Sequence, residues 1–320
     1  MNKTTVELAT LDILVQRALI NLGVEAAEAG IVKDVLMYAE KRGSSQGLIK
    51  IKERTVLPDP GCRPVDITRK TPAMITIDGG GHTGMYVLHQ AVEAARSAIA
   101  TCGIALVSTS NTRSSTGSIG FYARQLADDG YIAIVLAGSP KVMAIEGGID
   151  PLLGTNPIAI AIPTTDTSLV FDSATAAITW FSVIHARDNH QQLPEGVAID
   201  KHGTPTTNPV AAMQGALRTV AGAKGSALAL MIEFLTASLA DTSIAGDAED
   251  NRGNTLIAID PTRLLGEQRF YRNADRLIER VKASRSGSNT PVRLPGEASD
   301  SRAAQCESCL LYTSPSPRDS

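Results

Sequence analysis

Two short β-type runs near the middle of the chain narrow the folds it can adopt more than any other feature. Ile158–Ile162 and Leu169–Phe171 are each bounded by turn residues and are too short to be helices. Asp172–Ala177 follows, and its first two residues, an aspartate and a serine, can cap a helix by accepting bonds from free N–H groups. We therefore predict a helix entry here, where exposed N–H donors suit nucleotide phosphates. An ordinary strand–cap–helix turn without a ligand is the alternative that this stretch leaves open.

Strand-like and helix-like segments alternate along the rest of the chain, which favours an α/β fold. Residues 5–41 have the apolar spacing of two amphipathic helices, and Ile132–Ala137 has the pattern of a buried strand. Further strands are predicted at Met74–Ile77, 104–109 and Leu256–Ile259. Further helices are predicted at His89–Thr101, Ile119–Asp128, 211–240 with a break at Gly222–Gly225, and Glu267–Ala283. The sequence contains no strand–GxGxxG–helix unit, which argues against a Rossmann dinucleotide site.

The composition is that of an ordinary globular protein. The chain has 320 residues, of which 43% are hydrophobic and 20% charged, and its formal net charge is −3. It has no basic patch of the kind that nucleic-acid binding needs, and no apolar run approaches the ~20 residues that cross a bilayer. Its four cysteines form no evident disulfide framework, and a single CxxC at the C-terminal end is a weak metal signal. We therefore expect a cytoplasmic protein without a metal site and without nucleic acid or membrane as a partner.

Several segments, in order along the chain, resemble the malate/L-lactate dehydrogenase family. The most specific match is PLLGTNPIAIAIP (151–163) followed by FDSAT (171–175). The other matching segments are AEKRGSSQG (39–47), NPVAAMQGAL (208–217), GAKGSALALMIEFL (222–235), IAIDP (257–261) and VRLPGE (292–297). The resemblance spans roughly residues 4 to 300, and this collinear order is far more specific than any single motif.

The resemblance implies a particular fold and activity. Members of the family are nicotinamide-dependent reductases of 2-oxoacids and imino acids, unrelated to the Rossmann-type enzymes. For this chain the resemblance implies a mixed-sheet, non-Rossmann cofactor domain over residues 70–262, and a discontinuous helical domain from residues 1–69 and 263–307. It also implies NAD or NADP as the cofactor, a small carboxylate as the substrate, and a homodimer with its active site near the subunit interface.

Lys224 and Gly225 lie in a glycine-rich break at the head of an apolar segment. A cation beside free helix N–H groups can hold a phosphate, although a solvated lysine at a helix start is the plain alternative. In the family, the matching Lys–Gly pair lies against the cofactor. The residues that we assign to cofactor binding are Asn156, Asp172, Ser173, Ala174, Thr175, Lys224, Gly225, Gly296 and Glu297.

The predicted catalytic loop departs from the family pattern. Many members have Ser-His-Gly with the histidine as proton donor, whereas this chain has Gln46 in that place. A second family histidine falls near Ser115, and a family arginine falls at Lys50. An amide can hydrogen-bond a carbonyl oxygen but cannot give it a proton near neutral pH. The candidate catalytic residues are Ser45, Gln46 and Ser115, with Lys50 and Arg113 as clamps for the substrate carboxylate.

These substitutions leave two functions open. One is hydride transfer between nicotinamide and C2 of a small 2-hydroxy or 2-oxo acid, or of a cyclic imino acid. The other is nucleotide binding by a catalytically impaired homologue that lacks the usual acid. A cyclic imine can be protonated in water, whereas a ketone needs a proton as the hydride arrives. We therefore predict an activity that favours imino acids, or one in which water held by Gln46 and Ser115 is the proton source.

The C-terminal tail, residues 308–320, has no apolar periodicity and does not match the family. Its Pro- and Ser-rich end, Tyr312–Ser320, offers no face that a core could bury. We predict that this tail is disordered and non-native to the fold.

Overall fold

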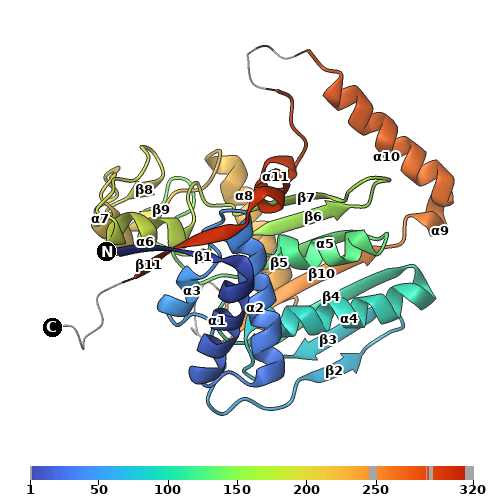
Figure 1. Ribbon diagram of the computed structural model, residues 1–320, viewed down its shortest axis with the longest axis horizontal. Helices are drawn as coiled ribbons and strands as arrows, with labels where there is room; N and C mark the ends of the chain where they lie inside the picture. Colours follow the sequence, from blue (N-terminus) through green and yellow to red (C-terminus); the bar gives the residue numbers. More distant parts are fainter. Residues whose placement is uncertain (1, 245–250, 286, 288–290, 314–320) are drawn as a thin grey trace.

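A seven-stranded mixed sheet forms the centre of the computed structural model, which describes residues 2–244, 251–285, 287 and 291–313 (Figure 1). The strand order is β2-β3-β4-β10-β5-β6-β7. β3 and β4 are parallel, and the other neighbours are antiparallel. The strands are β2 (Asp66–Arg69), β3 (Met74–Asp78), β4 (Ile104–Thr112), β5 (Ile132–Ala137), β6 (Ile158–Ile162), β7 (Leu169–Ser173) and β10 (Arg252–Ile259). The predicted mixed-sheet α/β class is confirmed.

Strand β10 joins the two halves of the sheet, although it is far from both in sequence. It pairs with β4 on one side and with β5 on the other. Its residues Leu256 and Ala258 are fully buried, so this late segment is part of the central core. The pairing also sets Arg252, at the start of β10, opposite Thr112 at the end of β4.

Helices cover the sheet and share one hydrophobic cluster with it. α4 (Gly84–Cys102) and α5 (Gly120–Asp128) lie along the face seen in Figure 1, with α1 (Leu8–Asn21) and α2 (Ala26–Lys41) beside them. The cluster runs from Leu36 of α2 through Leu88 of α4 to Val135 of β5. Within the described ranges, no helix has both the length and the apolar character needed to cross a membrane.

A smaller lobe lies beside the sheet. It contains α6 (Trp180–Asp188), α7 (Pro209–Gln214) and the paired strands β8 (Ala198–Ile199) and β9 (Ala216–Leu217), with a hydrophobic cluster of its own. α8 (Ala223–Glu233) follows and continues into a π-helix, η1 (Phe234–Ser238). The Thr255 hydroxyl donates to the Leu235 carbonyl at 2.6 Å, which fixes η1 against β10.

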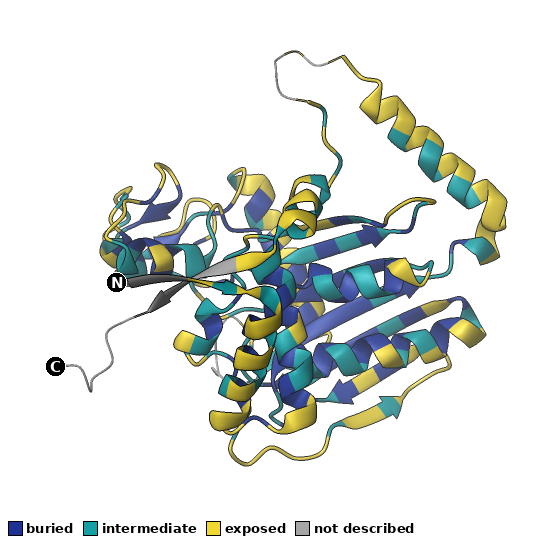
Figure 2. Ribbon diagram, in the orientation of Figure 1, coloured by how far each residue is buried: buried dark blue, intermediate teal, exposed yellow. Residues whose placement is uncertain are grey.

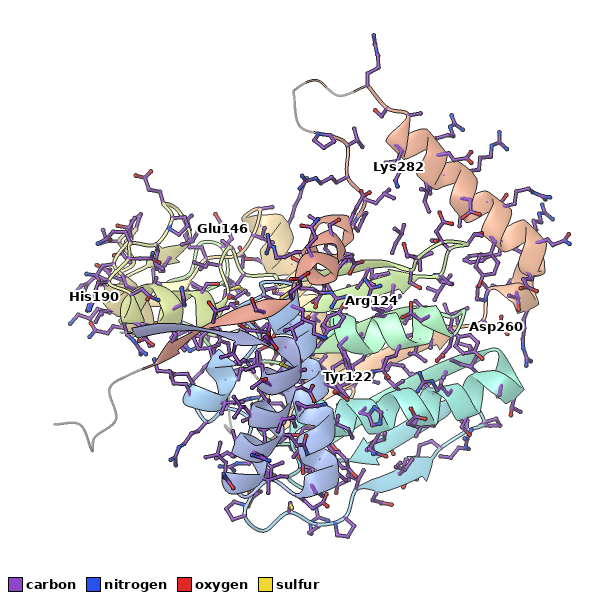
Figure 3. All side chains as sticks on the ribbon, in the orientation of Figure 1. Tyr122, Arg124, Glu146, His190, Asp260 and Lys282 are labelled. Carbon is purple, nitrogen blue, oxygen red and sulfur yellow. The ribbon has the colours of Figure 1, made fainter. Side chains whose placement is uncertain are left out.

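The C-terminal helices differ in how they contact the body. After α9 (Thr262–Leu265), α10 (Glu267–Lys282) projects away from the sheet, and none of its residues is buried (Figure 2). Lys282, labelled in Figure 3, lies on its last turn. α11 (Glu297–Gln305) returns to the body, where Asp300 pairs with Arg42, the C-cap residue of α2, at 3.0 Å and with Arg124 of α5 at 2.6 Å. α11 is therefore fixed to both α2 and α5, while the predicted domain boundaries stay a prediction.

The helix entry predicted at Asp172 is wrong. Asp172 and Ser173 continue β7, because they pair with Ala159 and Ile158 of β6. The next helix begins later, after Thr179, whose hydroxyl accepts from the Ser182 N–H. Pairing with β6 extends through both residues, and it overrides their local capping preference.

The helix predicted over 211–240 is interrupted by a strand pair. The chain turns at Gly215, and β9 then pairs with β8. A Cβ atom at position 215 would lie 2.2 Å from the Ile199 carbonyl oxygen, so this close approach requires glycine.

The disorder predicted for the tail is wrong for Ser308–Thr313. These residues form β11, which pairs antiparallel with β1 (Asn2–Glu7). The rest of the predicted tail, residues 314–320, lies outside the described residues.

Candidate active site

A cavity of about 610 Å³ lies at one edge of the central sheet. The carboxyl ends of β4, β5 and β7 and the amino ends of β6 and β10 meet at this edge, and residues next to each of them line the cavity. The segment around α3 (Ile49–Lys52) and the start of α6 complete the wall. The volume lies in the range of ~300–1,000 Å³ that small-molecule and cofactor sites occupy.

Cations outnumber carboxylates on the wall. Lys50, Arg54, Arg113 and Arg252 line the cavity, and Asp172 is the acidic residue among the described lining residues. These residues come from distant parts of the chain, so the fold rather than any local motif gathers them. Ammonium and guanidinium groups bind carboxylate and phosphate oxygens through charge-assisted hydrogen bonds. The arrangement suits a ligand with one or more anionic groups.

Lys50 is almost fully buried, with 1% of its surface exposed. Its Nζ donates to Ser115 Oγ at 2.7 Å and lies 3.7 Å from the centroid of the Phe181 ring. Burial, followed by repulsion from Arg252, lowers the pKa of Lys50 well below its ordinary range. The Lys50 ammonium therefore releases its proton more readily than that of a solvated lysine.

The loop after β4 places two serines at the wall. Ser115 Oγ accepts from Lys50 Nζ and from the Gly117 N–H at 3.1 Å, so its own hydrogen is the one that it can offer to a ligand. Ser114 has a φ of 61°, and its buried Oγ has no hydrogen-bond partner within the described part of the chain. Left-handed backbone and an unpaired buried hydroxyl are features that recur at ligand sites.

Two arginines of the wall are held in place by neighbouring groups. Arg113 Nη1 lies 3.3 Å from Asp59 Oδ2, and Arg252 Nη1 donates to the Ser114 carbonyl oxygen at 3.3 Å. These bonds fix the orientation of both guanidinium groups at the cavity. Because a guanidinium has five N–H donors, each arginine can also donate to a ligand. An oriented guanidinium loses less freedom when it binds an anion.

Asp172 lines the cavity near the end of β7. Its Oδ2 accepts from the Ser118 hydroxyl at 2.7 Å and from the Gly120 N–H at 2.8 Å. The side chain is open to the cavity, yet protein atoms crowd the carboxyl group, and this burial raises the pKa of Asp172 while the two hydrogen bonds oppose the rise. A Cβ atom at position 120 would lie 2.9 Å from Oδ2, so glycine permits the approach.

The predicted catalytic loop is at the cavity, but its members differ in position. Gln46 lines the wall, as do Ser115, Lys50 and Arg113. Ser45 is outside the lining, and its Oγ lies 2.7 Å from Oγ1 of Thr179, the residue that caps α6. Ser45 thus ties this loop to the helix that carries Phe181.

Five of the nine predicted cofactor residues lie on the β7 side of the cavity. Asp172, Ser173 and Ala174 line it. Asn156 and Thr175 are buried next to lining residues, where Asn156 Nδ2 donates to Glu233 Oε2 at 2.8 Å and the Thr175 hydroxyl donates to the Thr155 carbonyl at 2.9 Å. These two side chains support the wall rather than forming it.

The other four predicted cofactor residues lie outside the cavity lining. Lys224 is exposed at the start of α8, and Gly225 packs so closely on the Val220 carbonyl oxygen that a Cβ atom would lie 1.9 Å from it. Gly296 precedes α11, and Glu297 accepts from the Leu294 N–H at 2.9 Å. Contact of these residues with a cofactor stays a prediction.

The wall residues that were not predicted include Arg54, Ser114 and Arg252. Arg252 reaches the cavity because β10 inserts between β4 and β5, and no local pattern shows that insertion. The left-handed backbone of Ser114 has no signal in its residue type. Arg54 is close to the AEKRGSSQG segment, and its charge there was the one available signal.

Comparison with known proteins gives concordant matches. A family model described as malate/L-lactate dehydrogenase matches residues 6–309. L-sulfolactate dehydrogenase of Methanocaldococcus jannaschii is 32% identical over 290 residues, which cover 86% of this chain and 83% of that protein. Ureidoglycolate dehydrogenase (NAD(+)) of Escherichia coli is 30% identical over 289 residues, which cover 86% and 82%. The name of another relative, a (2R)-3-sulfolactate dehydrogenase, specifies NADP(+).

A solved structure extends the match to an enzyme named for a cyclic imino acid. It is the Δ1-piperideine-2-carboxylate reductase of Pseudomonas syringae, with a TM-score of 0.85 and 26% identity over 94% of each chain. The relatives are thus NAD(P)-dependent dehydrogenases and reductases that act on hydroxy acids and imino acids, and nothing among them supports a homologue that has lost catalysis.

Proposed function

The chain belongs to the malate/L-lactate dehydrogenase family, and we propose that it is an NAD(P)-dependent oxidoreductase. It moves a hydride between the nicotinamide and C2 of a small 2-hydroxy or 2-oxo acid, or of a cyclic imino acid. The observation that carries this proposal is the cavity at the sheet edge, where four cations and several hydroxyl groups face one carboxylate. Its cation-rich wall matches the carboxylate that these substrates share.

The wall fits a nicotinamide nucleotide as well as an acid. Cations bind pyrophosphate oxygens, and the buried Ser114 hydroxyl lacks the partner that a ligand would provide. The bound nicotinamide supplies hydride transfer, which no side chain can supply. We assign Asp172, Ser173 and Ala174 to hold it on the wall, and Lys224 with Gly225 to an outer contact.

We assign the substrate carboxylate to Arg113. Its guanidinium lines the cavity and is oriented by Asp59 at 3.3 Å. Gln46, on the same wall, can donate its amide N–H to the substrate oxygen. Binding the substrate at both ends holds C2 in one orientation, which is the main contribution that a positioning site makes to rate.

The test is to incubate the protein with NADH or NADPH and a panel of 2-oxoacids and cyclic imino acids, and to follow the absorbance of the reduced cofactor. We expect consumption with at least one substrate. Arg113→Gln should raise KM by roughly 10- to 100-fold, the equivalent of a lost charge-assisted hydrogen bond. Arg63→Gln, at an exposed arginine outside the cavity, is the matched control. Absence of cofactor consumption across the panel would contradict the proposal.

The protein is also proposed to be a cytoplasmic homodimer. Met231, Phe234 and Leu239, on α8, η1 and the residue after it, are each at least 50% exposed, and apolar groups gathered on one surface mark interfaces. The free cysteines Cys62 and Cys102 agree with a reducing compartment. Light scattering should give twice the chain mass for the wild type, and Phe234→Asp should shift it toward the monomer.

A further inference from the structure

Lys50 presents an unusual combination of burial and partners. A buried ammonium is costly unless a carboxylate neutralises it. Lys50 has instead a hydroxyl group at 2.7 Å and an aromatic ring at 3.7 Å, and no salt bridge joins it to an acid elsewhere in the described structure. A fold that needed only to fill this space had apolar residues available. An amine placed in this way is suited to chemistry at the cavity that it lines.

Three arginines and one acid share the cavity with Lys50. Arg54 comes from its own segment, Arg113 from the loop after β4, and Arg252 from β10. Helix α6 brings the uncharged Phe181 against it, and Asp172 is the acid on the β7 side of the wall. Burial and the positive charge of Arg252 lower the pKa of Lys50, so the ammonium is a better proton donor than a solvated lysine.

We propose that Lys50 and Ser115 together are the proton donor of this site, with Lys50 as the proton source and the Ser115 hydroxyl as the group that delivers it. The proposal rests on the function proposed above and deepens it. Ser115 accepts from Lys50 and from the Gly117 N–H, which leaves its own hydrogen to point at a substrate oxygen. This pair takes the place of the acid that Gln46 cannot be, and it replaces the clamping role predicted for Lys50.

The proton and the electrons balance in the following way. In reduction of a 2-oxoacid, C2 gains a hydride from the reduced nicotinamide, which becomes oxidised. The two π electrons of the C=O bond move to oxygen, which takes the proton of the Ser115 hydroxyl. Ser115 Oγ takes a proton from Lys50 Nζ at the same time, and Lys50 is left as a neutral amine. Oxidation runs the same transfers backward, with neutral Lys50 as the final base.

A cyclic imine separates this role from a structural one. Its nitrogen can be protonated in water before binding, so it does not need the Lys50–Ser115 pair. Lys50→Arg keeps the positive charge and the N–H donors but cannot lose a proton. We expect this variant to lower kcat for a 2-oxoacid by about 10²–10⁴-fold and kcat for Δ1-pyrroline-2-carboxylate by less than about tenfold. Ser115→Ala should give the same pattern, and Lys52→Arg, at an exposed neighbour, should leave both rates unchanged.

Equal losses for both substrates would mean that Lys50 only positions the substrate, and an undiminished 2-oxoacid rate in Lys50→Arg would mean that the acid lies elsewhere. Either result overturns the proposal. If the wild type consumes the cofactor with no substrate of the panel, the proposed function fails, and an NMR measurement without substrate then tests the role of Lys50 independently.

That measurement is an NMR titration of protein labelled with ¹³C at the lysine ε carbons, without cofactor or substrate. One resonance, absent from Lys50→Arg, should titrate at lower pH than the remaining lysines. In the rate profile, kcat/KM for 2-oxoacid reduction should fall as pH rises through that same titration, because the proton source is lost. A Lys50 resonance that titrates with the exposed lysines, near the ordinary value of about 10.4, contradicts the proposal.

Discussion

Two buried ionisable side chains, Glu28 of α2 and Lys50 beside the cavity, are each 1% exposed, but their surroundings differ. Both carboxylate oxygens of Glu28 have a partner: Oε2 lies 2.8 Å from His82 Nδ1, and Oε1 accepts from the Thr83 N–H at 2.8 Å. The partners of Lys50, in contrast, are the Ser115 hydroxyl group and the Phe181 ring. The Glu28 network ties α2 to the start of α4. Neither Glu28, His82 nor Thr83 lines the cavity, and the network meets the wall through the backbone, where the Arg113 N–H donates to the His82 carbonyl oxygen at 2.9 Å.

The difference shows how this fold treats charge inside and at the edge of its core. Where an ionic group holds elements together, its hydrogen-bonding capacity is met by the protein, because an unmet buried charge is destabilising. Where a group faces the cavity, part of its capacity is left for a ligand or a proton. Ser114 follows the second pattern, with a buried hydroxyl that lacks a partner among the residues described.

The largest effect on stability is expected from Glu28. Glu28→Ala leaves the Thr83 N–H and His82 without their acceptor, and it should lower the free energy of unfolding by about 3 kcal/mol. Glu25→Ala, which removes only the exposed cap of α2, is the control and should cost about 1 kcal/mol. Urea unfolding measures both. Similar losses in the two variants would show that the buried network contributes no more than a cap.

Lys50→Met should have a smaller effect of the opposite sign. Replacing the unneutralised ammonium by an apolar side chain should raise the free energy of unfolding by roughly 1–2 kcal/mol near pH 7, while 2-oxoacid reduction is lost. Because the pKa of Lys50 is lowered in the folded state, the unfolded chain binds more protons. Wild-type stability should therefore rise with pH from that lowered pKa toward about 10, and the advantage of the variant should shrink. A clear loss of stability in Lys50→Met would mean that Lys50, like Glu28, has a structural role.

The smallest effect is expected from the tail. We propose that residues 308–320 are non-native to the fold, even though Ser308–Thr313 pairs with β1. An isolated two-stranded ribbon is marginally stable in water. A chain that ends at Glu307 should unfold within about 0.5 kcal/mol of the full chain. A larger loss in urea unfolding would show that β11 is an integral part of the structure.

The sequence predicted those elements whose pattern is local. β5 and β6 begin and end where the apolar runs do, and α5 begins one residue late because Ile119 is its cap. The errors lie where distant partners decide the structure. Asp172 is in a strand because β6 pairs with it, and Gly215 breaks a helical pattern because β8 lies against it.

The candidate site shows the same division. The cavity residues Gln46, Lys50, Arg113, Ser115 and Asp172 were identified through the resemblance to the family. The bond between Lys50 and Ser115 joins residues 65 positions apart, and Arg252 arrives on a strand inserted from the far end of the chain. Such contacts depend on the sheet order, which no single segment contains.

The central claim, hydride transfer to C2, can be tested directly with a reduced cofactor that carries deuterium at C4 of the nicotinamide. The protein is incubated with this cofactor and a substrate that it consumes, and the product is examined by NMR and mass spectrometry. We expect deuterium at C2 of the 2-hydroxy acid or imino-acid product, in an amount equal to the cofactor oxidised. Cofactor oxidation that leaves C2 without deuterium, from cofactor labelled in turn on each face of C4, would contradict the account.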